Sequence, residues 1–498
     1  MIYNILLALY FAGTLLGLWF VFKKAGIAPW KALVPVYNIV VWIQMCNKKW
    51  TWYVYFLVPA INIFMFLLMV QETARVFRRY SFWEQLLAVI FPWIYLPIVG
   101  LSPKMQYHDP HTDPPAKVSE GRDWLDAIAF AIVAAVIIRG NVFELYGIPS
   151  SSMEKSLLVG DHLLVSKIAY GPRVATTPLS LPLVHNTIPL TNDRVESYLK
   201  WIQLPYHRYP GYTHIKRFDA VVFNFPEGDT TLNASPTNLV TYYDAKNDPS
   251  LRMMLAEGYR VRPVDKRQNY IKRCIGMPGD DLQIINRQVH INGEPLQLPR
   301  DAQFKYYPVF RQGTNVAQLL EKYGVSQEDI HRFASGDGLP LTMEQYERLK
   351  NSDHIVSLEP FAYEDIPQGI HMFPHTADNN WSMNNYGPVH IPAKGETLQL
   401  NDSTLPFYRR LITVYEGNTL EVRDGNIYIN GEQTDTYTCR QNYYWMMGDS
   451  RHNSQDSRVW GFVPEDHISG KARWILWSVD KDHHRLRWNR MFRNACAY

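Results

Sequence analysis

A cluster of three serines, Ser150–Ser152, follows a strand-like run and could supply a nucleophile. A serine in such a place most often forms a turn, so catalysis requires a base that can take the hydroxyl proton. In Tyr270–Ile275, alternation with a period of two places Lys272 on the same face as Tyr270 and Cys274. If that face turns inward, burial lowers the pKa of Lys272 and provides a neutral amine. The pair predicts nucleophilic catalysis by a serine with a lysine base.

The size of the required pKa shift bears on this hypothesis. An ordinary lysine has a pKa of about 10.4 and is neutral roughly one time in a thousand near pH 7. A shift of about two to three units recovers most of that loss and costs about 3–4 kcal/mol of folding free energy. A cost of this size indicates a functional role for Lys272.

A third segment, Met447–Pro464, combines many short polar residues with bounding glycine and proline. Such a composition predicts a loop held rigid by bonds between side chains and backbone. Within it, Asp456 and Arg458 could form a bidentate pair that fixes the loop's shape.

The chain after residue 140 is rich in Val, Ile, Tyr and Phe, interrupted by Gly, Pro, Asn and Asp, which indicates strands. The predicted strands are Val142–Ile148, His162–Lys167, Asp219–Phe225, Asn269–Ile275, Leu282–Ile285, Val289–Ile291 and Thr419–Arg423. Asn292-Gly293 and Asn430-Gly431 each follow an apolar alternation and predict hairpin turns. Residues 301–410 differ, with helical stretches near Val316–Tyr323 and Met343–Leu349, and are interpreted as an inserted accessory region.

The N-terminal quarter predicts a membrane module. Residues 1–22, 50–71 and 85–103 carry no charged side chain, and each is long enough to cross a hydrocarbon core of about 30 Å, although Pro92 and Pro97 must kink the third. Trp124–Ile138 is shorter and includes Asp126, so it spans only if Asp126 and Arg139 reach opposite interfaces. The alternative is a set of core helices in a soluble protein.

Basic residues predict the orientation of this module. The loop after the first run and the loop before the last are predicted to be cytoplasmic, which places everything after residue 139 outside. The basic residues that carry this inference are Lys23, Lys24, Lys31, Lys48, Lys49, Lys104, Lys117 and Arg122. Arg75, Arg78 and Arg79 fall on the wrong side, and Leu33–Met45 could be re-entrant, so the pattern allows three to five hydrophobic helices.

Composition excludes several other classes of protein. The 498 residues hold 50 Lys and Arg against 47 Asp and Glu, so no global field attracts nucleic acid. The four cysteines show no C-x-x-C spacing, which argues against a zinc module or a disulfide framework, although Cys274 and Cys439 could pair. We expect no metal and no organic cofactor.

Four motifs in order resemble those of type I signal peptidases, which are membrane-anchored leader peptidases with a Ser/Lys pair. The motifs read "IPSSSM…LLVGD", "RFDAVVF", "YIKRCIGMPGDDL" and "GDSRHNSQDSRVWGFVP". They lie within residues 141–300 and 411–478 and follow the hydrophobic N-terminal region.

The resemblance implies a role for each matching residue. Ser152 matches the nucleophile and Lys272 the general base, while Ser150 matches a hydroxyl that forms the oxyanion hole with the Ser152 backbone N–H. Ser454 matches the serine that orients the lysine. The remaining matches are the supporting pair and the pockets for small side chains: Asp456, Arg458, Tyr146, Ile148 and Ile271.

Two places depart from the family's usual pattern. Lys155 and Ser156 stand where the family usually has Pro and Thr, and His452 replaces a usual Asp. None of these changes removes a reacting group, but they affect the loops on either side of the site.

The residues allow two rival interpretations. Ser152 and Lys155 also fit the S-x-x-K pattern of penicillin-binding proteins, but the chain has no K-T-G, and Pro149 argues against a helix there. The second rival is a catalytically silent, membrane-anchored protein that binds preproteins on the same fold. Retention of both Ser152 and Lys272 favours catalysis.

The sequence therefore predicts an α-helical transmembrane module over 1–139 and a mainly-β catalytic domain over 140–300 and 411–478. An α+β region is inserted over 301–410, and a basic tail over 479–498 lies on a membrane surface or is a ragged end. The expected activity is cleavage of N-terminal signal peptides from exported preproteins, with small residues at the first and third positions before the cut. The expected location is a bacterial-type inner membrane, multi-pass, with the catalytic domain on the extracytoplasmic side. The oligomeric state is left open.

Overall fold

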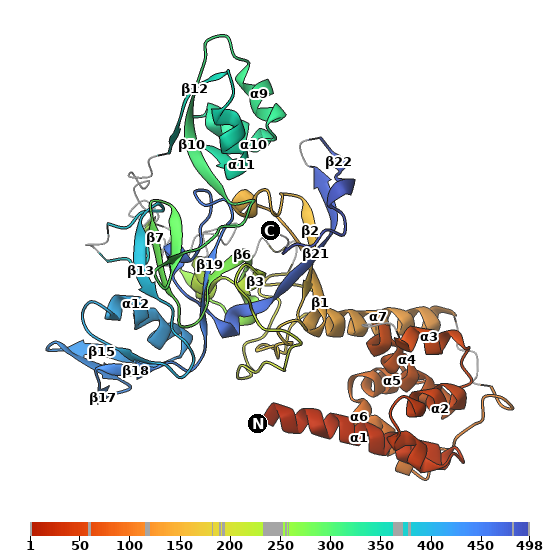
Figure 1. Ribbon diagram of the computed structural model, residues 1–498. Helices are drawn as coiled ribbons and strands as arrows, with labels where there is room; N and C mark the ends of the chain where they lie inside the picture. The colour runs from red at the N-terminus through yellow and green to blue at the C-terminus, as the bar shows by residue number, and fades with distance from the viewer. Residues whose placement is uncertain are drawn as a thin grey trace. The chain divides into compact units, whose positions relative to one another are not determined.

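The computed structural model divides the chain into two compact units, Met1–Val142 and Phe143–Tyr498, here called unit 1 and unit 2. Figure 1 shows the course of the chain through both. The residues described are 2–57, 61–114, 120–181, 183–188, 191, 195–232, 252–253, 256, 258–361, 372–376, 380–480 and 483–496.

Unit 1 is helical throughout its described elements. Its helices are α1 (Ile2–Lys24), α2 (Tyr37–Met45), α3 (Thr51–Leu57), α4 (Ile61–Val76), α5 (Phe82–Ile90), α6 (Pro92–Leu101) and α7 (Glu120–Asn141). Gly13, Gly17 and Gly100 allow α1 and α6 to approach closely, because a Cβ added at Gly17 would lie 2.4 Å from the Leu96 Cβ. Small residues spaced four apart commonly bring two helices together in this way.

The apolar runs of unit 1 form helices that are mostly shorter than expected. In the described residues no single helix has both the length and the apolar composition of a membrane span. Helices α5 and α6 taken together reach that length and composition. They are bent by 119° at their junction, where the sequence predicted a kink at Pro92. The transmembrane role of these helices stays a prediction. Lys117 lies outside the described residues, as do the side chains of Arg122 and Asp126.

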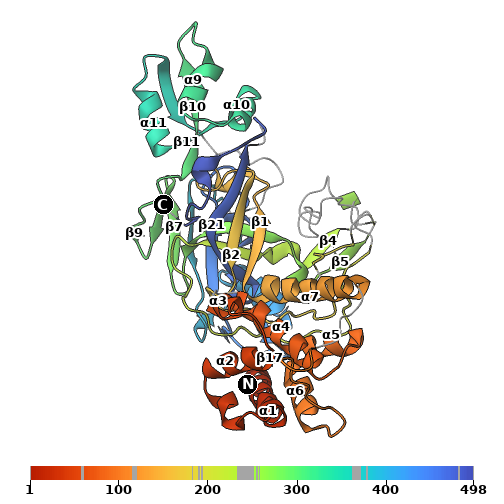
Figure 2. The same ribbon diagram turned by 90° about the vertical axis from the view of Figure 1, so that its right-hand side faces the viewer.

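Unit 2 is built around one antiparallel sheet with the strand order β1-β2-β21-β3-β6-β19-β20, and β22 pairs with β21. Figure 2 shows β1, β2 and β21 side by side. The strands are β1 (Phe143–Gly147), β2 (Asp161–Ser166), β3 (Ala220–Asn224), β6 (Asn269–Gly276), β19 (Tyr443–Met447), β20 (Val463–Pro464), β21 (Ile468–Asp480) and β22 (Arg485–Leu486). The mainly-β fold expected for the catalytic part of the chain is confirmed.

Smaller sheets pack beside the main one. Their strands are β4 (Thr230–Leu232), β5 (Tyr259–Val261), β7 (Asp281–Ile285), β8 (Gln288–Ile291), β9 (Glu294–Pro295), β13 (Tyr386–His390), β14 (Thr397–Gln399), β15 (Leu420–Arg423), β16 (Asn426–Ile429), β17 (Glu432–Gln433) and β18 (Thr436–Thr438). Both predicted hairpins are present, with positive φ at Asn292 and Gly293 and at Asn430 and Gly431, as their turn type requires. All seven predicted strands are observed as strands.

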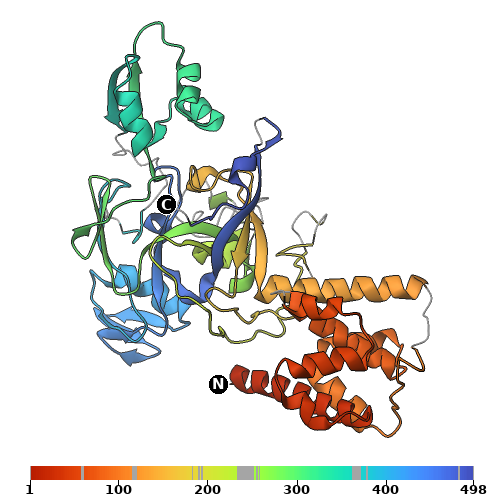
Figure 3. The same ribbon diagram turned by 45° about the vertical axis from the view of Figure 1, so that its right-hand side comes forward.

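The accessory region contains a subdomain with its own core. Strands β10 (Gln303–Phe310), β11 (Leu339–Thr342) and β12 (Ile355–Pro360) form its sheet, and helices α9 (Val316–Lys322), α10 (Gln327–Ala334) and α11 (Met343–Lys350) cover it. Figure 3 shows it as a separate green lobe of unit 2. We call residues 303–360 the inserted subdomain.

The inserted subdomain ends earlier than the boundary expected at residue 410. Strand β13 pairs with β7, and helix α12 (Leu405–Arg410) contributes Leu405 and Tyr408 to the same core as β7 and β8. Residues 386–410 therefore pack with the β-rich core, because their apolar side chains complete a cluster that 281–291 cannot close alone.

The C-terminal tail is part of unit 2. Strand β22 pairs with the end of β21, and the backbone of 492–495 bonds to β21 at Ile475 and Arg473. Arg490 is 6 % exposed and binds Asp161. Residues 485–496 are therefore not a ragged end, and the placement of the tail on a membrane surface stays a prediction. The four cysteines are free, so Cys274 and Cys439 are not paired.

Candidate active site

The Ser152 turn begins where β1 ends. Ser150 is extended, and Ser151–Met153 form a short 3-10 turn whose Met153 is 1 % exposed. Met153, Ile148 and Leu157 belong to one hydrophobic cluster, so the core on both sides holds the turn in place. Ser152 itself is only partly buried and lines a cleft.

Lys272 lies in the middle of β6, between β3 and β19 in the sheet. It is 5 % exposed, and its Nζ lies 2.5 Å from the Ser152 Oγ. The strand face that carries Lys272 therefore turns inward, which is the condition that the sequence analysis set for a neutral amine. The structure brings these two side chains together across 120 residues of sequence.

Burial controls the protonation of Lys272. Desolvation lowers its pKa to about 8, while the carboxylates of Asp456 and Asp449 act in the opposite direction and Arg458 lowers it further. Desolvation is the largest of these effects, so a substantial fraction of the amine is neutral near pH 8.

The loop from Gly448 to Arg458 holds the turn from the other side. The Ser450 N–H donates to the Ser152 carbonyl at 3.1 Å. Gly448 is required here, because a Cβ would lie 2.2 Å from the Ser454 Oγ and 2.6 Å from the Ser152 carbonyl oxygen. The loop and the Ser152 turn therefore fit against each other without room for a side chain at residue 448.

Asp456 and Arg458 form the predicted bidentate pair, with guanidinium-to-carboxylate distances of 2.9 and 2.8 Å. Both are almost completely buried, and Asp456 also accepts from the Gly448 N–H at 3.0 Å. Burial alone would raise the pKa of Asp456, but Arg458 and these hydrogen bonds keep it below its usual value. The pair remains ionised and fixes the loop.

A second buried pair was missed by the sequence analysis. Arg273 follows Lys272 on β6 and binds Asp449 at 2.6 Å, with both side chains inaccessible to solvent. Its Nη1 donates to the Phe218 carbonyl, and the Nη2 that binds Asp449 also donates to the Ser156 hydroxyl. The alternation along β6 placed Arg273 on the face opposite Lys272, but the burial of that face, which requires an acid, is seen only in the folded sheet.

Ser150 and Ser454 lie in the cleft with Ser152. Ser150 is exposed two residues before Ser152. Ser454 is 6 % exposed, and its hydroxyl donates to the Gln455 carbonyl at 3.3 Å rather than bonding to the Lys272 amine. The structure brings all three serines to one cavity without joining Ser454 to the lysine.

The cleft around Ser152 has a volume of about 950 Å³. Tyr146, Ile148 and Ile271, expected to line pockets for small side chains, all border it. The Tyr146 hydroxyl donates to Glu144 at 2.6 Å, which holds the ring at the wall.

Two of the residues that depart from the family pattern, Lys155 and His452, contact the inserted subdomain. The Lys155 amine donates to the Gly324 carbonyl at 2.6 Å, and the His452 Nδ1 accepts from the Lys305 N–H at 3.0 Å. Lys155 has a φ of +71°, which a proline cannot adopt. Because its amine binds Gly324 and the backbone is extended at Glu154, the S-x-x-K interpretation fails.

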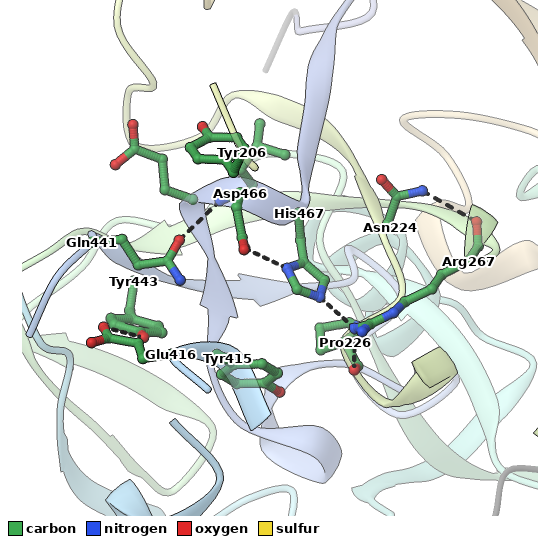
Figure 4. A network of polar contacts seen from close by, with 12 residues as sticks. Tyr206, Asn224, Pro226, Arg267, Tyr415, Glu416, Gln441, Tyr443, Asp466 and His467 are labelled. Carbon is green, nitrogen blue, oxygen red and sulfur yellow. Dashed lines mark hydrogen bonds and ion pairs between the residues drawn. The ribbon is translucent and has the colours of Figure 1, made fainter. Parts of the chain in front are cut away.

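Figure 4 shows a network of polar contacts around His467 and Arg267, which precede β21 and β6 in the chain. His467 lies between Asp466 and Arg267, at 2.6 Å from each. Burial lowers the pKa of His467 to about 4, so the neutral ring donates to Asp466 and accepts from Arg267. This network joins the turn before β21 to the segment that enters β6, and its role is structural.

Comparison with known proteins agrees with this geometry. A family described as signal peptidase, peptidase S26, matches residues 121–370 and 432–477, more than half of the chain. The chain belongs to the signal peptidase family. Residues 30–110 also match DUF5684, a family of unknown function.

Several relatives named signal peptidase I match at low identity over most of their length. The protein of Haemophilus influenzae is 23 % identical over 376 residues, 73 % of this chain and 72 % of the relative. That of Buchnera aphidicola from Acyrthosiphon pisum is 23 % identical over 354 residues, 70 % and 73 % of the two chains. That of Rickettsia rickettsii is 23 % identical over 359 residues, 72 % and 80 %. The chain is a serine peptidase that cleaves signal peptides.

Proposed function

We propose that this signal peptidase cuts preproteins with Ser152 as nucleophile and Lys272 as general base. The observation that carries the proposal is the 2.5 Å contact between the Ser152 Oγ and the buried Lys272 amine. Because its pKa is lowered to about 8, Lys272 can accept a proton at neutral to alkaline pH.

The reaction proceeds in two halves. Lys272 takes the proton of Ser152 as the Oγ attacks the scissile carbonyl, and returns it to the amine that leaves with the mature protein. The signal peptide is then an ester of Ser152. Lys272 takes a proton from water, the hydroxide attacks the ester, and the proton goes back to the Ser152 oxygen as the bond breaks.

Ser150 and the Ser152 backbone N–H stabilise the oxyanion in both halves. Ser150 is two residues before the nucleophile in extended backbone and borders the cleft, which supports this role. A donor of this kind contributes about 10²–10³ in kcat. Ser454, Asp456 and Arg458 maintain the loop that packs against Ser152, and Ser454 acts on Lys272 through the shape of that loop.

The substrate binds as an extended strand beside β1. Its first and third residues before the cut enter pockets formed by Tyr146, Ile148 and Ile271, and these pockets suit small side chains such as alanine. The strand edge supplies affinity through backbone hydrogen bonds, and the pockets supply selectivity.

Unit 1 anchors the enzyme in a bacterial-type inner membrane, with the catalytic unit on the extracytoplasmic side. The basic residues of the N-terminal loops support this orientation. A segment of unit 2 that includes the cleft residue His185 also exposes large apolar side chains suited to a bilayer surface. They are Leu179, Leu181, Leu183, Val195, Leu199, Trp201 and Ile202.

The test uses detergent-solubilised full-length protein and a preprotein with an Ala-x-Ala site. Ser152→Ala and Lys272→Ala should each lower the cleavage rate by about 10³ or more. Ser180→Ala serves as the control, because this hydroxyl binds the Thr177 carbonyl at 2.8 Å and does not border the cleft. Cleavage by Ser152→Ala at the wild-type rate would refute the assignment.

A further inference from the structure

The inserted subdomain reaches the cleft that holds Ser152. Lys305 of β10 and two residues of α10, Glu328 and Arg332, border the same cavity as Ser152 and Lys272. None of the four motifs of the resemblance lies in this subdomain. One wall of the cleft is therefore built from an element that carries none of the four motifs.

Hydrogen bonds hold the subdomain against the loop that follows β19. The Gln303 N–H donates to the Asp449 carbonyl at 2.8 Å, and the Arg451 N–H donates to the Gln303 carbonyl at 2.9 Å. The Lys305 N–H donates to His452, and the Phe304 ring packs edge-on against the same imidazole. Backbone hydrogen bonds in both directions thus join the start of β10 to the loop that follows β19.

A second set of contacts holds the subdomain against the nucleophile turn. The Lys155 amine binds the Gly324 carbonyl at 2.6 Å, in the connection that leads into α10. The Ser151 hydroxyl lies 3.5 Å from Glu328 and accepts from Asn453 at 2.9 Å. Two separate attachments fix α10 beside Ser152.

The direction of the substrate places α10 after the cut. In the proposed binding mode the residues before the cut lie along β1, beside Tyr146 and Ile148, and the scissile carbonyl lies at Ser152 beyond the end of β1. An extended chain that continues past Ser152 leaves β1 and meets the side of the cleft where Glu328 contacts Ser151. The first residues of the mature protein therefore pass α10.

We propose that Glu328 and Arg332 read the charge of the first residues of the mature protein, an inference that rests on the proposed function. The two side chains form an ion pair one helical turn apart and are 44 % and 38 % exposed. An exposed pair of this kind is worth at most about 1 kcal/mol, so either partner can exchange it for a charge on the substrate. A basic residue of the mature segment binds Glu328, and an acidic one binds Arg332.

Lys305 and His452 also border the cleft, but neither offers a charge to the substrate. Lys305 binds both carboxylate oxygens of Asp337 at 2.7 Å. His452 is neutral, because burial and the surrounding guanidinium groups hold its pKa well below its usual value while its Nδ1 accepts from Lys305. Glu328 and Arg332 thus present the two exposed charges of α10 to the cleft.

The experiment compares three preproteins that differ only in the residues after the cut, which are acidic, neutral or basic. For Glu328→Gln, Arg332→Gln and the wild type, kcat/KM is measured on each, and the basic-to-acidic ratio is taken within each variant. We expect Glu328→Gln to lower this ratio about three- to fivefold and Arg332→Gln to raise it by a similar factor. A ratio within one preparation is insensitive to partial loss of folded enzyme.

The matched control is the pair Glu344 and Arg348 on α11, which has the same spacing in the same subdomain and does not border the cleft. Glu344→Gln and Arg348→Gln should leave the ratio unchanged. The inference is overturned if Glu328→Gln and Arg332→Gln also leave it unchanged, or shift it in the same direction. Failure of the Ser/Lys assignment shows differently, as cleavage of the neutral preprotein by Ser152→Ala.

Discussion

At the scale of the residue, Lys272 is an ionisable side chain in surroundings that disfavour its charged form. Its folded pKa of about 8 lies below the value of 10.5 that an exposed lysine has. Between these values the unfolded chain binds a proton that the folded chain does not, so stability rises with pH across this window. Below about pH 8 the folded protein bears the full cost of the buried ammonium.

Replacement of Lys272 by methionine should therefore stabilise the protein while it abolishes catalysis. At pH 7 we expect Lys272→Met to raise the free energy of unfolding by an amount on the order of 3 kcal/mol, because burial lowers the pKa of Lys272 from 10.5 to about 8. The gain should shrink toward pH 10. Chemical denaturation at pH 7 and pH 10 measures both effects, and a variant less stable than the wild type at pH 7 would contradict the burial argument.

Sequence reasoning named the residues that we propose to react and the Asp456–Arg458 pair, but it missed a second buried pair. Alternation along β6 placed Lys272 and Arg273 on opposite faces, but only the three-dimensional sheet shows that both faces are buried. Asp449 was therefore not recognised as the acid that Arg273 requires. The role inferred for Ser454 came from resemblance, and its hydroxyl bonds to Gln455 instead.

At the scale of the element, the Ser152 turn carries a buried carboxyl group that lies near the acids of α10. Glu154 is 7 % exposed, and burial raises its pKa to about 7, with Lys155 acting against this shift and Asp329 and Glu328 adding to it. A carboxyl group with a raised folded pKa contributes stability at low pH that is lost as pH rises toward 7. The turn and α10 are thus less firmly joined in alkaline solution.

Removal of the Glu154 charge should stabilise this junction only where the carboxyl would ionise. We expect Glu154→Gln to raise the free energy of unfolding by about 1–3 kcal/mol at pH 8 and to have little effect near pH 4.5. Glu344→Gln, on exposed α11, is the control and should change neither value. Equal effects of Glu154→Gln at both pH values would show that Glu154 is not held neutral.

The C-terminal tail supports the same turn. Arg490 binds Asp161 at 2.6 Å and donates to the Ser156 carbonyl at 2.9 Å, and Asp161 is fully buried. Arg490→Ala leaves that carboxylate unpaired, so we expect a loss of about 3–5 kcal/mol in urea unfolding. Asp161→Asn in the same chain should recover part of the loss, and an unchanged midpoint in Arg490→Ala would contradict the proposed support.

Elements with a strong local pattern were predictable, and elements defined by distant partners were not. The Asn-Gly hairpins and the helix at Met343–Lys350 follow from local turn chemistry and helical spacing. The long strand β21 was missed, because it pairs with β2 and β3 far back in the chain. The edge of the inserted subdomain also depends on a distant strand, β7, which pairs with β13.

At the scale of the whole molecule, the chain combines a helical unit with a β-rich peptidase unit. The apolar surface of the helices and the exposed apolar segment around Trp201 support membrane attachment. The full-length protein in lipid vesicles should stay with the lipid during flotation at high salt and at alkaline pH, because hydrophobic burial is insensitive to both. Release by either treatment would indicate a peripheral, charge-based association.

The central claim is that Lys272 takes the proton of Ser152 as a neutral amine. The most direct measurement is the pH dependence of the rate at which Ser152 is acylated by a preprotein, followed in a single turnover by mass spectrometry of the trapped acyl-enzyme. With a pKa lowered to about 8, the rate should rise about tenfold per pH unit below that value and level off above it. A rate that continues to rise toward pH 10.5, or one governed by a group near pH 4, would contradict the account.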